Sequence, residues 1–259
     1  MKKFVIASLG MGLLLTSQGV VHAADGGDYE TKGTVKFIPS TEPTNPVDPT
    51  NPDPDKPVSP LNPDGSKPEP GTKGPLSIDY ASSFDFGLNK ISNKTETYYA
   101  RAQVYGDESL VTPNYVQISD NRGSNAGWKL TVKQNGQFTN EATLNKELTG
   151  SVIKLTNPTV KTNAQGITAP VTTSIINLDP AGAESVVMSA VKDTGAGTWV
   201  NSWGTVEQIT EKNDKNEDVT ANVTKDIALT LPGSTPKDAV SYATTLTWTL
   251  TDVPTNEDE

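Results

Sequence analysis

The sequence contains no cysteine and a single histidine, His22, among its 259 residues. Without cysteine the chain has no disulfide, no thiolate metal site, no cysteine nucleophile and no lipid attached through a thiol. Basic residues are also few, 21 against 31 acidic ones, and the net charge of −10 argues against non-specific binding to nucleic acid, which needs basic patches. Hydrophobic residues make up only 34% of the chain, which indicates that part of it does not pack.

The first 23 residues have the pattern of a secretory signal peptide. Two lysines near the start precede an apolar run from Phe4 to Leu15, and Val21-His22-Ala23 offers small residues for signal peptidase. A membrane anchor is the weaker interpretation, because about 20 apolar residues are needed to span a bilayer. Cleavage after Ala23 removes both lysines and the histidine but no acid, so the net charge falls from −10 to −12.

The opposite end of the chain bears on how the protein is retained. Residues 255–259 are acidic and polar, with no apolar tail and no basic stop. We therefore expect neither a sortase-type anchor nor, without cysteine, a lipid anchor. An extracellular protein of this kind that stays on the cell surface must be held there non-covalently.

Two segments precede the main domain. Residues 24–38 include the alternating stretch Gly33 to Ile38, which predicts one short strand. Residues 39–75 hold 12 of the 19 prolines, several at every third position, which favours an extended polyproline II rod. We interpret this segment as a disordered, acidic, Pro-rich spacer that has too little apolar surface to pack. A ligand for a proline-reading domain is the alternative.

Residues 76–256 read as one all-β domain. Clean alternation of apolar and polar residues runs over Gly127–Lys133 and over Val240–Leu250, and turn signals such as Asn135-Gly136 separate the candidate strands. Many short strands at this spacing predict a single β-sandwich or distorted barrel.

The sequence predicts no enzyme. Past residue 23 there is no His or Cys for a nucleophile with its base, or for the usual zinc sites. The triplet Asp193-Thr194-Gly195 resembles that of aspartic proteases, but that chemistry needs a second, facing aspartate, and a β-turn explains the triplet better. The acids suggest no glycosidase pair or calcium loop by their spacing. We expect no catalytic residue, no cofactor and no metal.

A repeated tetrapeptide stands out instead. Trp128-Lys129-Leu130-Thr131 and Trp248-Thr249-Leu250-Thr251 are both W-x-L-T, and each lies in an alternating segment. Trp and Leu two residues apart share one face of a strand, so these side chains are expected mainly in the core. An exposed aromatic platform for sugar rings is the alternative, and Trp199 and Trp203, in a glycine-flanked loop-like stretch, are further candidates for such a platform.

These features together resemble a known family. The signal peptide, the acidic proline segment, Gly74 to Tyr80 and the two Trp-x-Leu strands are similar to the WxL domain proteins of low-GC Gram-positive bacteria. The resemblance covers nearly the whole chain. It implies non-covalent attachment to the cell wall, apparently through peptidoglycan, with WxL-interacting and sortase-anchored proteins as partners. By the same resemblance Trp128, Leu130, Trp248 and Leu250 match the motif implicated in attachment.

We therefore expect a secreted surface protein that attaches to peptidoglycan or an associated wall polymer. The alternative is a host-matrix or glycan adhesin that a partner protein holds on the surface. An extracellular hydrolase of wall glycan is a third, weaker hypothesis, because the catalytic motifs are missing.

Overall fold

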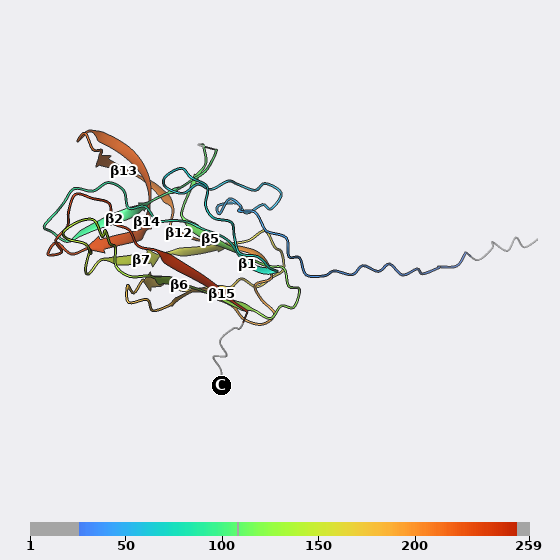
Figure 1. The fold of residues 1–259 in the computed structure, drawn as a ribbon. Coiled ribbons are helices and arrows are strands. Elements are labelled where there is room, and N and C mark those ends of the chain that lie inside the picture. Colours follow the sequence, from blue (N-terminus) through green and yellow to red (C-terminus); the bar gives the residue numbers. More distant parts are fainter. Residues whose placement is uncertain (1–25, 108, 253–259) are drawn as a thin grey trace, which may run out of the picture. The chain divides into compact units, whose positions relative to one another are not determined.

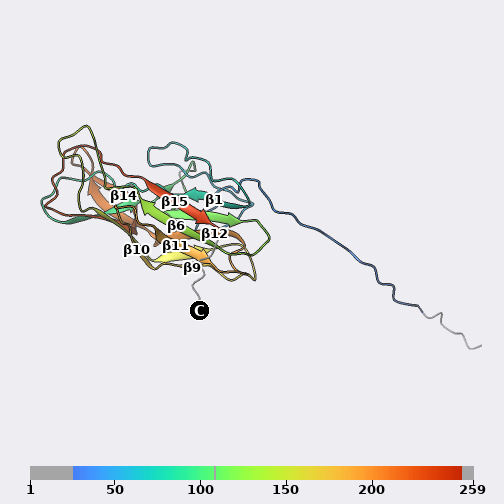
Figure 2. The ribbon, with the colours of Figure 1, turned by 60° about the horizontal axis from the view of Figure 1, so that its bottom comes forward.

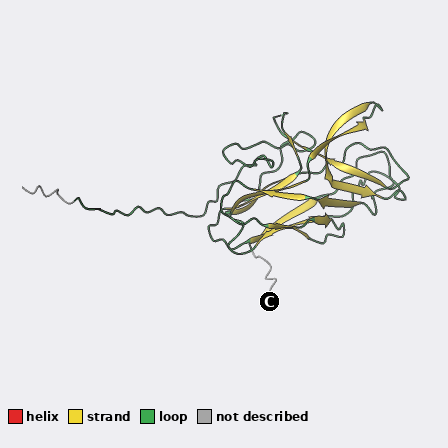
Figure 3. Ribbon diagram, turned by 180° about the vertical axis from the view of Figure 1, so that it is seen from behind, coloured by secondary structure: helices red, strands yellow, loops and turns green. Residues whose placement is uncertain are grey.

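The structure, a computed structural model, describes residues 26–107 and 109–252. The predicted signal peptide, residues 1–23, lies outside these ranges. The chain divides into two compact units, residues 1–37 and residues 38–259. The described part of the chain contains fifteen strands and no helix, and therefore no helix that could cross a membrane (Figure 3).

Three antiparallel sheets form the second unit (Figure 1). The first orders its strands as β1 (Leu76–Ala81), β5 (Tyr115–Asp120), β12 (Gly197–Trp203) and β8 (Pro158–Lys161). The second orders them as β10 (Ile175–Asn177), β7 (Val152–Thr156), β14 (Asp218–Leu231) and β13 (Val206–Lys212), and β2 (Glu96–Arg101) also pairs with β14. The third orders them as β15 (Leu246–Thr251), β6 (Trp128–Gln134), β11 (Ser185–Ala190) and β9 (Val171–Thr172). A small ribbon pairs β3 (Gln103–Val104) with β4 (Val111–Thr112).

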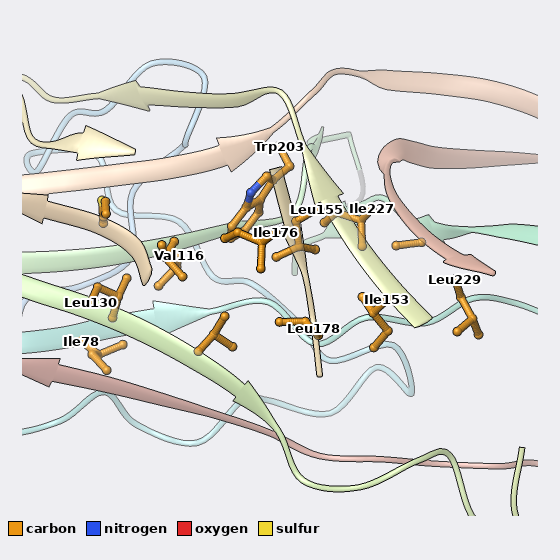
Figure 4. Close-up of a cluster of buried hydrophobic side chains, with 14 of the residues drawn as sticks. Ile78, Val116, Leu130, Ile153, Leu155, Ile176, Leu178, Trp203, Ile227 and Leu229 are labelled. Carbon is orange, nitrogen blue, oxygen red and sulfur yellow. The ribbon is translucent and has the colours of Figure 1, made fainter. Parts of the chain in front are cut away.

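One hydrophobic cluster joins the three sheets (Figure 4). Ile118 of β5, Leu130 of β6 and Leu155 of β7 are all buried in it. Apolar residues at every second position of these strands point to this cluster, so each sheet covers the apolar face of another. The predicted all-β fold is confirmed.

The predicted strand in the N-terminal segment is not formed. Residues 33–38 are extended but pair with no described strand, and Val35 and Phe37 are 78% and 85% exposed. An alternating sequence supplies only one half of a strand pair, and without a partner its hydrogen-bonding groups remain with water.

The Pro-rich segment differs from the prediction in its middle part. Val47 is fully buried in a second cluster with Tyr80, Tyr105, Tyr115 and Val200, and Pro60 forms a bridge with Tyr105. The expectation that this segment packs nothing is therefore wrong around Val47 and around Pro60, although many residues between and on either side of them are exposed. The few aliphatic residues of the segment suffice because the domain supplies an aromatic pocket for them.

Two buried glutamines hold the backbone of this segment. Gln117 accepts a hydrogen bond from Val47 N at 2.8 Å and donates one to Asn45 O at 3.0 Å. Gln103 donates to Leu61 O at 2.9 Å and accepts one at 2.6 Å from the hydroxyl of Tyr80. Burial raises the pKa of Tyr80 to about 12, so its hydroxyl keeps the donated proton at neutral pH. Proline has no N–H, so the Pro-rich segment cannot form the regular backbone hydrogen bonds of a strand. The side chains of Gln117 and Gln103 supply hydrogen bonds to its backbone instead.

Gln117 is itself positioned by the buried carboxylate of Asp79. Asp79 is 5% exposed and accepts hydrogen bonds from Ser77 Oγ at 2.7 Å, Ser119 Oγ at 2.6 Å and Gln117 Nε2 at 2.9 Å. Burial raises its pKa above the ordinary value of 3.8, because desolvation outweighs the three hydrogen bonds.

A raised folded-state pKa predicts a specific pH dependence. Protonated Asp79 favours the folded protein, so its contribution is fully present below pH 3.8 and is lost as the pH rises through the folded-state pKa. In urea unfolding, the free energy of unfolding of the Asp79→Asn variant should therefore rise relative to that of wild type as the pH increases from about 4 to 7. Ser82→Ala serves as the control, because it removes a buried hydrogen bond to Gln103 but neither a titrating group nor a partner of Asp79. A constant difference between Asp79→Asn and wild type across this range would contradict the assignment.

Candidate functional site

The two Trp-x-Leu segments lie on neighbouring antiparallel strands, β6 and β15 (Figure 2). Leu130 is directly opposite Leu250, and Trp248 is opposite Val132. All of these side chains share the face that packs on the core. The two tryptophans are four positions apart along the ladder, about 13 Å. The two motifs, 120 positions apart in the sequence, therefore contribute to one surface.

Trp128 is a core residue, as the alternation predicts. Its side chain is 0% exposed, and its indole Nε1 donates a 2.8 Å hydrogen bond to Gly195 O. A Cβ at Gly195 would collide with Ala190 and lie 2.8 Å from the same indole nitrogen. The triplet that resembles an aspartic protease is thus a turn that closes over Trp128, with Asp193 and Gly195 at positive φ.

Trp248 is in a different environment. β15 begins at Leu246 rather than at the predicted Val240, and it is an edge strand of its sheet among the described strands. Trp248 is half-buried and packs against Trp203, with ring centroids 6.1 Å apart. One side of this motif residue remains accessible.

The predicted surface platform of Trp199 and Trp203 is wrong. Both residues lie in β12, and they are only 2% and 1% exposed. The glycines around them suggested a loop, but Gly197 begins the strand and Gly204 follows it at positive φ. Trp203 lies beneath the surface, where its ring contacts Trp248 and meets Phe84 edge-on at 6.4 Å.

A cavity of about 340 Å³ opens beside Trp248. We call it the aromatic cavity; its rings come from four residues, Phe84, Phe86, Phe138 and Trp248. Phe86 and Phe138 meet edge-to-face at 6.1 Å, which fixes both rings. The exposed residues Ser83 and Thr245 also line it, whereas the hydroxyls of Ser82 and Thr244 already donate to Gln103 and to Gly136 O. Fixed rings with a few hydroxyls form a surface suited to a neutral ligand that has both CH faces and OH groups.

A comparison with known protein families identifies the family of this chain. The sequence matches the family of WxL domains, described as surface cell wall-binding, over residues 24–254. The chain belongs to the WxL family. No curated protein and no solved structure matches this chain.

A WxL domain is a surface domain that binds the cell wall. The four residues of the two Trp-x-Leu motifs occupy two kinds of position in this chain. Trp128, Leu130 and Leu250 build the sheet in this chain, whereas Trp248 also reaches the aromatic cavity. Within the described ranges no group of three or more acidic or histidine residues is arranged to hold a metal.

The phenylalanines of the aromatic cavity were not predicted as site residues from the sequence. Phe84 and Phe86 follow β1, and Phe138 follows β6, so nothing in their spacing connects them with Trp248. The available signal was the alternation of Phe84-Asp85-Phe86, which places two rings on one side of an extended segment.

Proposed function

We propose that this WxL protein is secreted and attaches non-covalently to peptidoglycan. The single observation that carries the proposal is the half-buried Trp248, a motif residue of a wall-binding family that lines a cavity of aromatic rings. Aromatic faces pack against the CH faces of pyranose rings without needing charge. The predicted signal sequence and the absence of cysteine support export followed by attachment without a covalent bond.

Charge supports binding to the glycan rather than to anionic wall polymers. The chain without its first 23 residues has a net charge of −12, so polymers rich in phosphate repel it. Attachment through ring packing and hydrogen bonds depends little on ionic strength, because screening acts on charges. We also propose WxL-interacting and sortase-anchored surface proteins as neighbours, which rests on the resemblance to the family.

Sedimentation with purified peptidoglycan sacculi tests the attachment. The chain without its first 23 residues should sediment with the sacculi, and 1 M NaCl should not release it. Trp248→Ala should weaken the affinity for sacculi at least about fivefold, because aromatic stacking on a ring is worth about 1–3 kcal/mol. Its melting temperature should fall less than that of Trp128→Ala, since one side of Trp248 already faces the cavity.

Leu144→Ala is the matched control, since Leu144 is an apolar residue that is 90% exposed and lies outside the aromatic cavity. This variant should bind as wild type does. If the wild-type protein stays in the supernatant at every salt concentration, direct attachment is excluded and the adhesin held by a partner becomes the better hypothesis.

A further inference from the structure

A second cavity adjoins the aromatic cavity. This polar cleft has a volume of about 310 Å³ and shares Ser83 with the aromatic cavity. Leu61 and Pro63, from the Pro-rich segment, form part of its wall, and Asn222 of β14 lies at another part. The segment predicted to be a spacer therefore helps to build a concave site in the folded domain.

An unsatisfied buried amide lies in this cleft. Asn114 lines it and is only 1% exposed, yet its side-chain oxygen has no hydrogen-bond partner among the described residues. A buried amide without its hydrogen bonds is destabilising by about 1–3 kcal/mol. Asn222, half-buried in the same cleft, makes its hydrogen bond to Ala102 N through the backbone oxygen, and its amide group is left for a ligand.

The charges around the cleft disfavour an anionic ligand. Arg101 and Asp85 line the cleft, and the Arg101 guanidinium is already paired with Glu211. One positive group against two negative ones leaves a net negative surrounding, so a carboxylate or phosphate gains nothing there. The cleft thus favours a neutral ligand that has amide groups and apolar CH faces. The CH faces of such a ligand would pack against Leu61 and Val104.

We propose that the polar cleft binds the acetamido group of a neutral N-acetylated amino sugar. An acetamido group offers one N–H and one C=O, which are the partners that the free amides of Asn114 and Asn222 require. The pyranose ring of the same or a neighbouring sugar unit contacts the aromatic cavity across Ser83. This inference rests on the proposed attachment to glycan and adds the chemical group that is recognised.

Two trisaccharides with the same β-1,4 linkage test the inference. Tri-N-acetylchitotriose should give saturable chemical-shift changes in the chain without its first 23 residues, and cellotriose, which has hydroxyls in place of the acetamido groups, should bind at least about tenfold more weakly. Equal binding of the two sugars, or preferential binding of the dipeptide analogue N-acetylalanine methylamide, would overturn the assignment.

Variants separate recognition from folding. Asn114→Ala should weaken tri-N-acetylchitotriose binding about five- to tenfold without lowering the melting temperature, because the side-chain oxygen of Asn114 has no hydrogen bond that the folded protein would lose. Asn222→Ala should act in the same direction, and Asn163→Ala, at an exposed position outside the cleft, is the control. Unchanged sugar binding in both cleft variants would place the ligand elsewhere.

Sedimentation with sacculi shows whether only the cleft assignment fails or whether the proposed attachment fails as well. If the trisaccharide does not bind but the protein still sediments with sacculi, the cleft assignment fails and the proposed attachment stands. If the protein neither binds the trisaccharide nor sediments, both are wrong.

Discussion

A chain that begins at Leu76 is expected to melt roughly 10–20 °C below a chain that begins at Pro39. The truncation exposes the pocket of Val47, leaves Gln117 without its partners Val47 N and Asn45 O, and removes the Leu61 O partner of Gln103. Each of these losses amounts to about 1–3 kcal/mol. In a domain of this size, 1 kcal/mol corresponds to about 2–4 °C in melting temperature. Differential scanning calorimetry of the two chains measures the difference.

A longer chain and a point variant show whether packing of the Pro-rich segment causes the difference in melting temperature. A chain that begins at Ala24 should melt at the same temperature as the one that begins at Pro39, because residues 26–37 are exposed throughout. In the full segment, Val47→Ala should reproduce part of the loss, about 1–2.5 kcal/mol, because Val47 is completely buried. Equal melting temperatures for the Pro39 and Leu76 chains would show that the segment is a spacer after all.

Trp128→Ala is expected to lower the free energy of unfolding by about 3–5 kcal/mol, which corresponds to roughly 6–20 °C. The indole is fully buried between β6 and the turn at Gly195, and its removal leaves a large cavity and an unpaired carbonyl. The wall-binding function of this variant should be lost only when the domain unfolds, because Trp128 does not reach either cavity.

Trp128→Phe separates the two parts of that effect. It keeps most of the apolar volume but removes the hydrogen bond to Gly195 O, so the expected loss is smaller than for Trp128→Ala. A Trp128→Ala protein that melts like wild type but no longer sediments with sacculi would show that Trp128 binds the wall directly.

The Trp-x-Leu strands were predictable because they depend on local pattern. Alternation over Gly127–Lys133 places Trp128, Leu130 and Val132 on one face, and the structure buries all three. Trp199 and Trp203 were misplaced because neighbouring glycines suggested a loop, whereas pairing of β12 with both β5 and β8 makes it a central strand. Propensity alone does not report how many partners a strand has.

The sequence by itself determined the fold class and the family. Periodicity of two, the paired motifs and the missing cysteine and histidine are all properties that can be read along the chain. Only the tertiary structure decided which tryptophan reaches a cavity and whether the Pro-rich segment packs. Both depend on contacts between residues far apart in sequence, such as Val47 with Gln117 and Trp248 with Trp203. Composition indicates how much apolar surface a segment has, but a partner pocket elsewhere in the fold decides whether it is buried.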